Sequence, residues 1–268
     1  MMASVALDPA LESLLAFWAE AGVDAAVEDE PVDRLQRPAP ARIVPAAAAQ
    51  AAVPPALGAA GVRGDLAAAI AEARRFAAGA ADLPDLLAAA ASFDPGPFRP
   101  AGARRTALLR GDAPADVVVI GGAPGADEDE VGTAFAGAEG RLLDRMLAAA
   151  GLGGRALLAH AVLWRTPGDR PPTPEEAALS RPFLERAVAL AAPKALLLLG
   201  DAPARLVLGR EEGVLKLRRE ALTWSPEGDG TALPAHVTFG PGFLLRQSQA
   251  KKRAWDDLLS LNQRVVGA

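Results

Sequence analysis

Apolar residues along the chain gather in short runs that are separated by polar, glycine-rich and proline-rich stretches. Four runs have the length and apolar composition of strands buried on both faces, at residues 117–120, 155–163, 194–199 and 233–238. Segments with apolar residues at helical spacing lie between them. Because strands alternate with helices, the pattern predicts a parallel sheet that is covered by helices on both faces.

Several of the predicted helices have recognisable start and stop signals. The helix expected at 141–150 carries one apolar face, and Gly151 can close it. Thr173 is the expected N-cap of a helix that runs to about residue 192, with Pro174 in its first turn. Two further helices are expected at 202–208 and 249–261.

The first 92 residues are expected to form a helical extension, and residues 93–268 are expected to form the α/β domain. The expected elements of the extension are an amphipathic helix at 10–21, a short acidic helix or turn at 24–34, a helix at 65–78 capped by Asp65, and a helix at 82–92. Residues 37–61 are rich in Pro and Ala and are expected to form a linker or a partly disordered arm.

A glycine-rich turn, GGAPGA at 121–126, follows the first strand. It lacks the Gly-Lys-Ser/Thr of a phosphate-binding loop and the G-x-G-x-x-G of a dinucleotide site, and acidic residues follow it. Exposed backbone N–H groups beside an aromatic Phe135 suit a flat, neutral ligand such as a base, at the strand ends where α/β sheets bind ligands. A tight strand-to-helix connection is the alternative. Residues 126–140 are expected to form a polar loop.

Composition narrows the class of protein. The 268 residues are 51% apolar and carry a net charge of −5, with no cysteine and two histidines. No disulfide, thiolate-bound metal or iron–sulfur cluster is therefore possible, and no cofactor or metal is expected. With no membrane-length apolar run and no signal peptide, a soluble cytoplasmic protein is expected. Only four of the 28 basic residues are lysine, which is typical of a GC-rich bacterial genome.

Ordered motifs over residues 105–262 resemble the uracil-DNA glycosylase superfamily, most closely its family 4, the iron–sulfur branch. They are GGAPGADED (121–129), GTAFAG (132–137), GRLLD (140–144), PTPEE (172–176), SRPFL (180–184), PKALLLLG (193–200) and FLLRQ (243–247). The resemblance implies a three-layer α/β/α fold with a four-stranded parallel sheet. It also implies DNA base-excision repair, in which a flipped base is held in a pocket and its N-glycosidic bond is hydrolysed.

The chain departs from the family at positions that carry the chemistry. By this resemblance the family's motif glutamate is Gly122, its uracil-reading asparagine is His160, and the histidine of its His-Pro motif is Gly240. The cluster cysteines are absent, and Trp164 and Ser180 occupy two of their positions. Uracil excision is therefore expected to be far below that of a typical family member.

The resemblance also assigns the expected site residues. The base-binding residues are Gly121, Gly122, Ala123, Pro124, Phe135 and His160. His160 is the candidate catalytic residue, although a strand-end histidine satisfied by backbone is an equal alternative. Phe135 could instead be a core residue, and His236, inside the last strand, is expected to be structural.

DNA contacts are expected from the C-terminal part of the chain. Leu244 or Leu245 would wedge into the duplex, and the residues expected to meet phosphates are Arg246, Lys251, Lys252 and Arg253. An ordinary solvated basic face is the alternative interpretation of the same residues.

Three functions remain open at this point. The first is a DNA-repair glycosylase with weak or altered base preference, acting on single- or double-stranded DNA. The second is a catalytically inactive relative that binds DNA, or a protein partner through the helical extension. The third, a nucleotide-binding α/β protein unrelated to repair, is disfavoured because no phosphate-gripping motif is present.

Overall fold

The computed structural model describes residues 59–227 and 232–266. The predicted elements at 10–21 and 24–34, and most of the proposed linker, lie outside the described residues. The helix expected at 65–78 is longer than predicted: α2 spans Ala59–Gly79 and includes the last residues assigned to the linker. Asp65 therefore lies inside this helix and does not cap it, because the helix already begins at Ala59.

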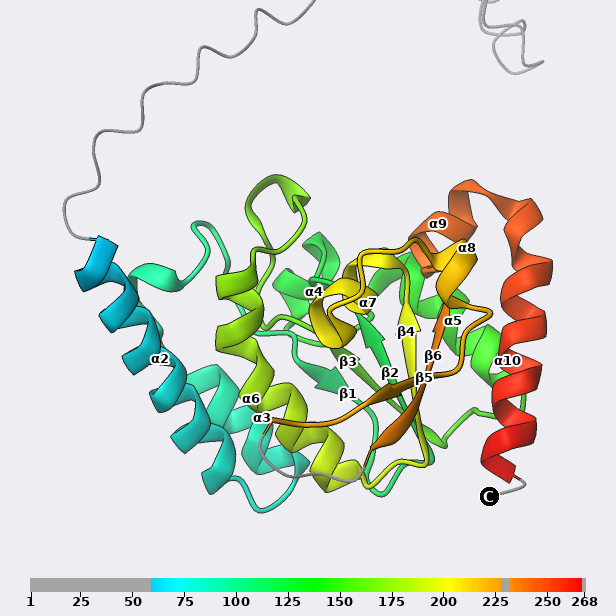
Figure 1. Ribbon diagram of the computed structural model, residues 1–268, viewed down its shortest axis with the longest axis horizontal. Helices are drawn as coiled ribbons and strands as arrows, with labels where there is room; N and C mark the ends of the chain where they lie inside the picture. Colours follow the sequence, from blue (N-terminus) through cyan, green and yellow to red (C-terminus); the bar gives the residue numbers. More distant parts are fainter. Residues whose placement is uncertain (1–58, 228–231, 267–268) are drawn as a thin grey trace, which may run out of the picture. The chain divides into compact units, whose positions relative to one another are not determined.

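The four predicted parallel strands are confirmed, and they form the centre of a larger sheet (Figure 1). The central strands are β2 (Val117–Gly121), β3 (Ala156–His160), β4 (Ala195–Leu199) and β6 (Leu233–Thr238). The expected total of four strands is wrong, because antiparallel β1 (Leu109–Arg110) and β5 (Leu222–Trp224) complete a six-stranded sheet of order β1-β3-β2-β4-β6-β5. Strands of two and three residues are too short to leave a periodic signal in a sequence.

Each face of the sheet packs against its own layer of helices. Along β2, Val118 and Ile120 belong to one hydrophobic cluster and Val117 and Val119 to the other, as alternation along a strand requires. Helix α6 packs on the first face, with α2 and α3 packed against α6, and α5 and α10 cover the second face (Figure 1). The expected three-layer α/β/α architecture is confirmed.

The remaining elements follow the predicted order with shifted ends. They are α3 (Leu83–Ser92), η1 (Gly96–Phe98), α4 (Ala126–Val131), α5 (Gly137–Ala149), η2 (Pro167–Asp169), α6 (Pro174–Ala191), α7 (Asp201–Leu208), α8 (Val214–Leu217), α9 (Pro241–Arg246), η3 (Ser248–Ala250) and α10 (Lys251–Val266). Thr173 caps α6 as expected, and its side chain accepts a hydrogen bond from the Glu176 amide. Gly151 follows α5 with a φ of 77°, the left-handed conformation of a closing glycine.

The polar loop expected at 126–140 is wrong, because it contains α4 and the start of α5. Three acidic residues fill the first turn of α4, where they interact favourably with the helix dipole. The side chain of Glu128 also reaches back to the amide of Gly125. The acidic run that suggests a solvated loop is therefore a helix start.

An aromatic cluster joins the helices before residue 93 to the rest of the chain. Phe93 lies 6.0 Å from the ring of Trp164 and 5.4 Å from that of Phe183, measured between centroids. Ser180 completes this region: its hydroxyl accepts from the Leu163 amide and donates to the Glu176 carbonyl. The two positions that the resemblance assigns to cluster cysteines are thus filled by a packed ring and a satisfied hydroxyl.

We predict that Gly140→Ala destabilises the protein. A Cβ at position 140 would lie 1.6 Å from the carbonyl oxygen of Phe135, so α5 or the Phe135 segment must shift. We expect a loss of about 1–3 kcal/mol in the free energy of unfolding, measured by urea denaturation. Gly79→Ala is the control, because a Cβ added at position 79 would meet no neighbouring atom within 4 Å. This substitution should change the free energy of unfolding by no more than about 1 kcal/mol. Equal effects of the two substitutions would contradict the prediction.

Candidate functional site

A cleft of about 820 Å³ opens at the carboxyl ends of the central strands. The turn after β2, the end of β3 and the start of α9 all contribute to it. Of the residues expected to form the site, Gly121, Gly122, Ala123, Pro124, Phe135, His160 and Gly240 all line this cleft. The strand register explains why, since Gly121 pairs with His160 across β2 and β3. The structure thus brings the predicted residues together, and His236 is not among those that line the cleft.

Glu128 holds the centre of the site together, although sequence reasoning placed it in a loop. Its Oε1 accepts hydrogen bonds from the Phe135 amide at 2.7 Å and from His160 Nε2 at 2.9 Å. Its Oε2 accepts from the amide of Gly125. The side chains of His160 and Glu128 are 4% and 11% exposed, so the pair is removed from water.

These contacts set the charge of the pair. Burial alone would raise the pKa of Glu128, but the hydrogen bond and charge of His160 and the amides of Gly125 and Phe135 outweigh it and lower this pKa. Glu128 is therefore a carboxylate near neutral pH, and His160 Nε2 donates the proton in their bond. The other ring nitrogen, Nδ1, has no partner among the residues that the structure describes.

The imidazole of His160 stacks on the ring of Phe135. Their centroids lie 4.6 Å apart with 19° between the planes. Both rings pack directly on the backbone of Gly121, because a Cβ there would lie 2.6 Å from Phe135 Cζ and 2.9 Å from His160 Nδ1. One face of the Phe135 ring is thus covered by a side chain of the protein itself. The one hydrogen bond of the His160 ring among the described residues, at Nε2, goes to a carboxylate and not to backbone as the alternative supposed.

Gly122 and Gly240, the other two positions at which the resemblance expects a side chain, lie in close packing. A Cβ at Gly122 would lie 3.3 Å from the Cβ of Ala202, and one at Gly240 would lie 3.1 Å from the carbonyl oxygen of Leu199. Neighbouring atoms therefore lie close to both positions. Neither glycine marks an open slot that a larger side chain could enter without local adjustment.

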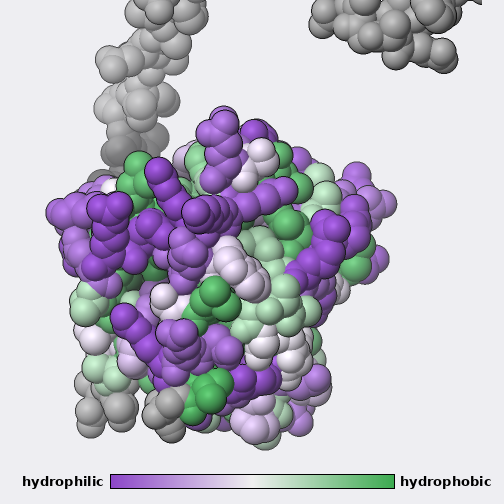
Figure 2. All heavy atoms as spheres, turned by 90° about the vertical axis from the view of Figure 1, so that its right-hand side faces the viewer, coloured by the Kyte–Doolittle hydropathy of each residue, from purple (hydrophilic) through white to green (hydrophobic). Residues whose placement is uncertain are grey.

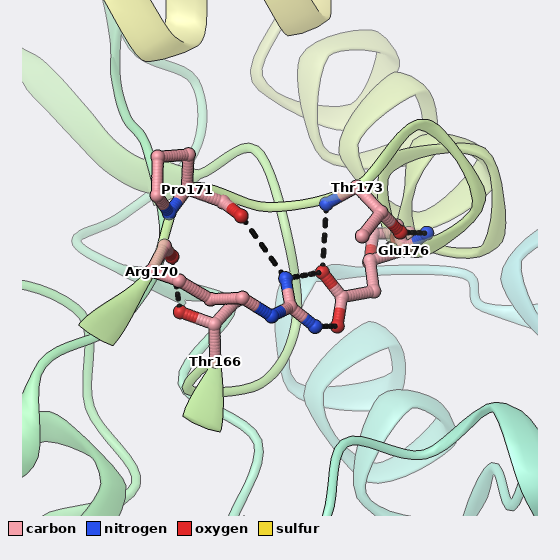
Figure 3. A network of polar contacts seen from close by, with 6 residues as sticks. Thr166, Arg170, Pro171, Thr173 and Glu176 are labelled. Atoms are coloured by element: carbon pink, nitrogen blue, oxygen red, sulfur yellow. Dashed lines mark hydrogen bonds and ion pairs between the residues drawn. The ribbon is translucent and has the colours of Figure 1, made fainter. Parts of the chain in front are cut away.

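A network of polar contacts fixes the loop that forms one wall of the cleft (Figure 3). The guanidinium of Arg170 donates to both oxygens of Glu176, at 2.9 and 2.7 Å. Glu176 also accepts from the Thr173 amide at 2.8 Å, and Thr166 Oγ1 donates to the Arg170 carbonyl at 2.5 Å. The loop between β3 and α6 is therefore held to the start of α6.

Glu139, in the first turn of α5, is a second carboxylate of the cleft that sequence reasoning missed. Partial burial and the negative charge of Glu128 raise its pKa, although Arg246, His160 and the amide of Gly242 act in the opposite direction. The sequence signal was present, because an acidic residue in the first turn of a helix after the turn motif faces the same strand ends. It was missed because the expected helix began at 141, which left Glu139 in the expected loop.

The predicted DNA-contacting residues gather near one end of the cleft. Leu245 is 47% exposed and lines the cleft with Arg246. Leu244 is fully buried in the core, so it cannot wedge into a duplex, whereas its neighbour Leu245 faces solvent. Lys251, Lys252 and Arg253 are exposed in the first turn of α10. Figure 2 shows hydrophilic side chains over the upper part of this face, where α9 and the start of α10 lie.

Two properties of the described residues bear on other functions. Within 59–227 and 232–266, no group of three or more His, Asp or Glu side chains is placed to hold a metal ion. None of the helices in the same ranges is long and apolar enough to cross a membrane.

Comparison with known proteins confirms the resemblance. The model of the uracil DNA glycosylase superfamily matches residues 110–259. A type-4 uracil-DNA glycosylase of Thermotoga maritima is 31% identical over 153 residues, which cover 56% of this chain and 77% of the relative. The type-4 enzyme of Archaeoglobus fulgidus is 39% identical over 98 residues, or 36% of this chain and 49% of the relative. That of Sulfurisphaera tokodaii is 25% identical over 160 residues, or 57% and 71%.

We predict that Glu128→Gln destabilises the protein in a pH-dependent way. The amide would place N–H groups against donors, so we expect a loss of about 1–3 kcal/mol in the free energy of unfolding at neutral pH. Because the folded state lowers the pKa of Glu128, its contribution is complete above the ordinary value of 4.5 and is lost as the pH falls through the folded value. The difference between wild type and variant should therefore shrink below pH 4.5.

Denaturation with urea at a series of pH values measures this difference. Glu130→Gln is the matched control, since Glu130 is exposed in the same helix. A constant difference between wild type and Glu128→Gln down to strongly acidic pH would contradict the assigned charge of Glu128.

Proposed function

Because the chain belongs to the uracil DNA glycosylase superfamily, we propose that it acts on DNA in base-excision repair, binding a flipped base in the cleft with weak or altered glycosylase activity. The observation that carries the proposal is which side chains stand at positions 122, 160 and 240 of the cleft. Gly122 and Gly240 present no side chain, and His160 is bonded to Glu128. The turn, the aromatic ring and the cleft itself remain.

The chemistry of uracil excision explains why these positions matter. When the glycosidic bond breaks, the sugar gains cationic character and the leaving uracil gains negative charge. Donors aimed at the base oxygen stabilise that charge, and the loss of one donor costs about 3 kcal/mol, or roughly a hundredfold in rate. Gly240 offers no side-chain donor, and Gly122 cannot position the attacking water. Two such losses would slow the reaction by about a thousandfold or more, although the effects need not add.

The surface beside the cleft supports DNA binding by a route that does not depend on those positions. Leu245 is an exposed apolar residue at the rim, next to Arg246. The basic first turn of α10 follows within a few residues. Phosphate contacts from such side chains give affinity without reading the base. A protein partner for the helical extension stays a prediction.

A second function, a catalytically inactive DNA-binding relative, is favoured by one specific observation. The His160 ring lies against Phe135 at stacking distance, on a ring that the family uses to stack the flipped base. A base could use that face only if the imidazole moved away and the buried bond to Glu128 broke. Breaking a charge-assisted hydrogen bond of this kind costs about 1.5–3 kcal/mol.

We predict that the unmodified protein excises uracil at least about a thousandfold more slowly than a typical family member. A gel assay on single- and double-stranded oligonucleotides with one uracil measures the rate. Gly122→Glu, His160→Asn and Gly240→His together should raise it, because they restore the family's polar groups. Thermal unfolding of the variant must accompany the assay, since both glycines lie in close contacts. Rapid uracil excision by the wild type would refute this prediction.

We also predict that the basic side chains beside the cleft carry most of the DNA affinity. Lys251→Ala with Lys252→Ala should weaken binding of a fluorescent duplex several-fold at low salt and reduce the slope of log affinity against log salt by about 2. Fluorescence anisotropy at several salt concentrations measures both quantities. Arg75→Ala, on the exposed face of α2, is the control with an unchanged slope. An unchanged slope in the double variant would show that this surface is only solvated.

A further inference from the structure

Two aromatic rings and a guanidinium pack on one another where β6 ends and α9 begins. The guanidinium carbon of Arg218 lies 5.8 Å from the centroid of the Phe239 ring, within the range of a cation–π contact. The ring of Phe243 lies 5.4 Å from that of Phe239, with 15° between the planes, which is an offset-stacked arrangement. Phe239 is buried, whereas Phe243 is 41% exposed. The group therefore runs from a buried cation to an aromatic ring at the surface.

Hydrogen bonds fix the buried end of this group. Arg218 donates to both oxygens of Asp257, at 3.0 and 2.7 Å, and to the Arg253 carbonyl at 2.9 Å. Thr238 Oγ1 donates to Asp257 at 2.7 Å. The side chains of Arg218 and Asp257 are 11% and 15% exposed, so this bidentate pair is largely removed from water. The ring of Phe243 thus rests on a support that is already in place before any ligand binds.

The exposed ring lies outside the cleft but next to its rim. Phe243 is not among the residues that line the cleft, whereas Pro241, Leu245 and Arg246 of the same helix line it. A base held in the cleft would therefore not cover Phe243. A ligand that reaches this ring must extend beyond the cleft along α9.

The charge beside the ring is positive. Residues 246–256 contain one acidic residue, Asp256, and four basic residues, Arg246, Lys251, Lys252 and Arg253. Glu139 offsets part of the charge of Arg246, since the two interact. The three basic side chains of α10 are exposed and form no ion pair within 4 Å among the described residues. Asp257, the acidic residue in contact with the buried end of the group, is already neutralised by Arg218.

We propose that the exposed ring of Phe243 is a stacking platform for an unpaired base of single-stranded DNA, on a nucleotide next to the one whose base enters the cleft. The proposal deepens the DNA binding proposed above and rests on it. An aromatic face beside basic side chains suits a single strand, because bases stack on the ring while phosphates meet the cations.

The form of the DNA follows from the geometry of stacking. A base inside a duplex is covered on both faces by its neighbours, so it has no free face for Phe243. A base in a single strand has one. Every base has a π face, so the platform distinguishes single-stranded from duplex DNA and does not read sequence. Leu245 has no ring, and its apolar side chain at the rim cannot replace this contact.

Two fluorescent oligonucleotides of equal length separate stacking from phosphate contacts. One is an oligothymidylate, and the other carries the same phosphates on abasic sugars. Fluorescence anisotropy with the full-length protein measures both affinities. We expect the wild type to bind the oligothymidylate about tenfold more tightly, because stacking of one base on one aromatic ring contributes affinity of this order.

Substitutions at position 243 assign the contact to the ring. Phe243→Ala should weaken oligothymidylate binding about tenfold and leave binding of the abasic oligomer unchanged. Its slope of log affinity against log salt should equal that of the wild type, because no phosphate contact is lost. Phe243→Trp should bind like the wild type, whereas Phe243→Leu, which is apolar but has no π face, should be weakened like the alanine variant. Val266→Ala, 63% exposed at the end of α10, is the control with unchanged affinity.

Four outcomes would overturn the proposal. Equal losses for both oligomers in Phe243→Ala would show that the ring is needed for the structure and not for stacking. Wild-type affinity of Phe243→Leu would show an apolar contact that needs no ring. Binding of both oligomers without any effect at position 243 would refute the platform while leaving phosphate-dependent DNA binding in place. Absence of binding to either oligomer would refute the platform together with the DNA binding on which it rests.

Discussion

The carboxylate of Glu128 is the contact on which the site depends. It joins the turn after β2, the segment before α5 and the end of β3, because it accepts hydrogen bonds from Gly125, Phe135 and His160. A buried carboxylate with this many donors is stable only while all of them stay in place. The backbone of the turn, the conformation of Phe135 and the orientation of the imidazole are therefore fixed together.

This coupling bears on the positions at which the resemblance expects other side chains. His160, where the resemblance expects an asparagine, has a carboxylate partner in Glu128 and an aromatic neighbour in Phe135. The close packing around Gly122 and Gly240 points the same way. The contacts around positions 122, 160 and 240 form one consistent set, so a single substitution there meets a site that is arranged for the present residues.

The sequence predicted the parts of the fold that local patterns determine. Apolar runs located the four parallel strands, and Thr173 located the start of α6, because burial and capping leave direct marks on the chain. The edge strands were missed because pairing of two or three residues depends on a neighbour far away in sequence. Glu128 and Glu139 were missed for a related reason. Glu128 lies in α4, a helix of six residues with too little length for a periodic signal, and Glu139 lies in the first turn of α5, before the expected helix start at 141.

The packing of Trp164 against Phe93, with Ser180 beside it, has a consequence for the circumstances in which the protein can form. The resemblance places cysteine ligands of an iron–sulfur cluster at two of these positions, and this chain has no cysteine at all. Its core is completed by ordinary side chains during folding. Folding of this region therefore requires no thiolate-bound cluster, and its packing holds whether the surroundings are reducing or oxidising.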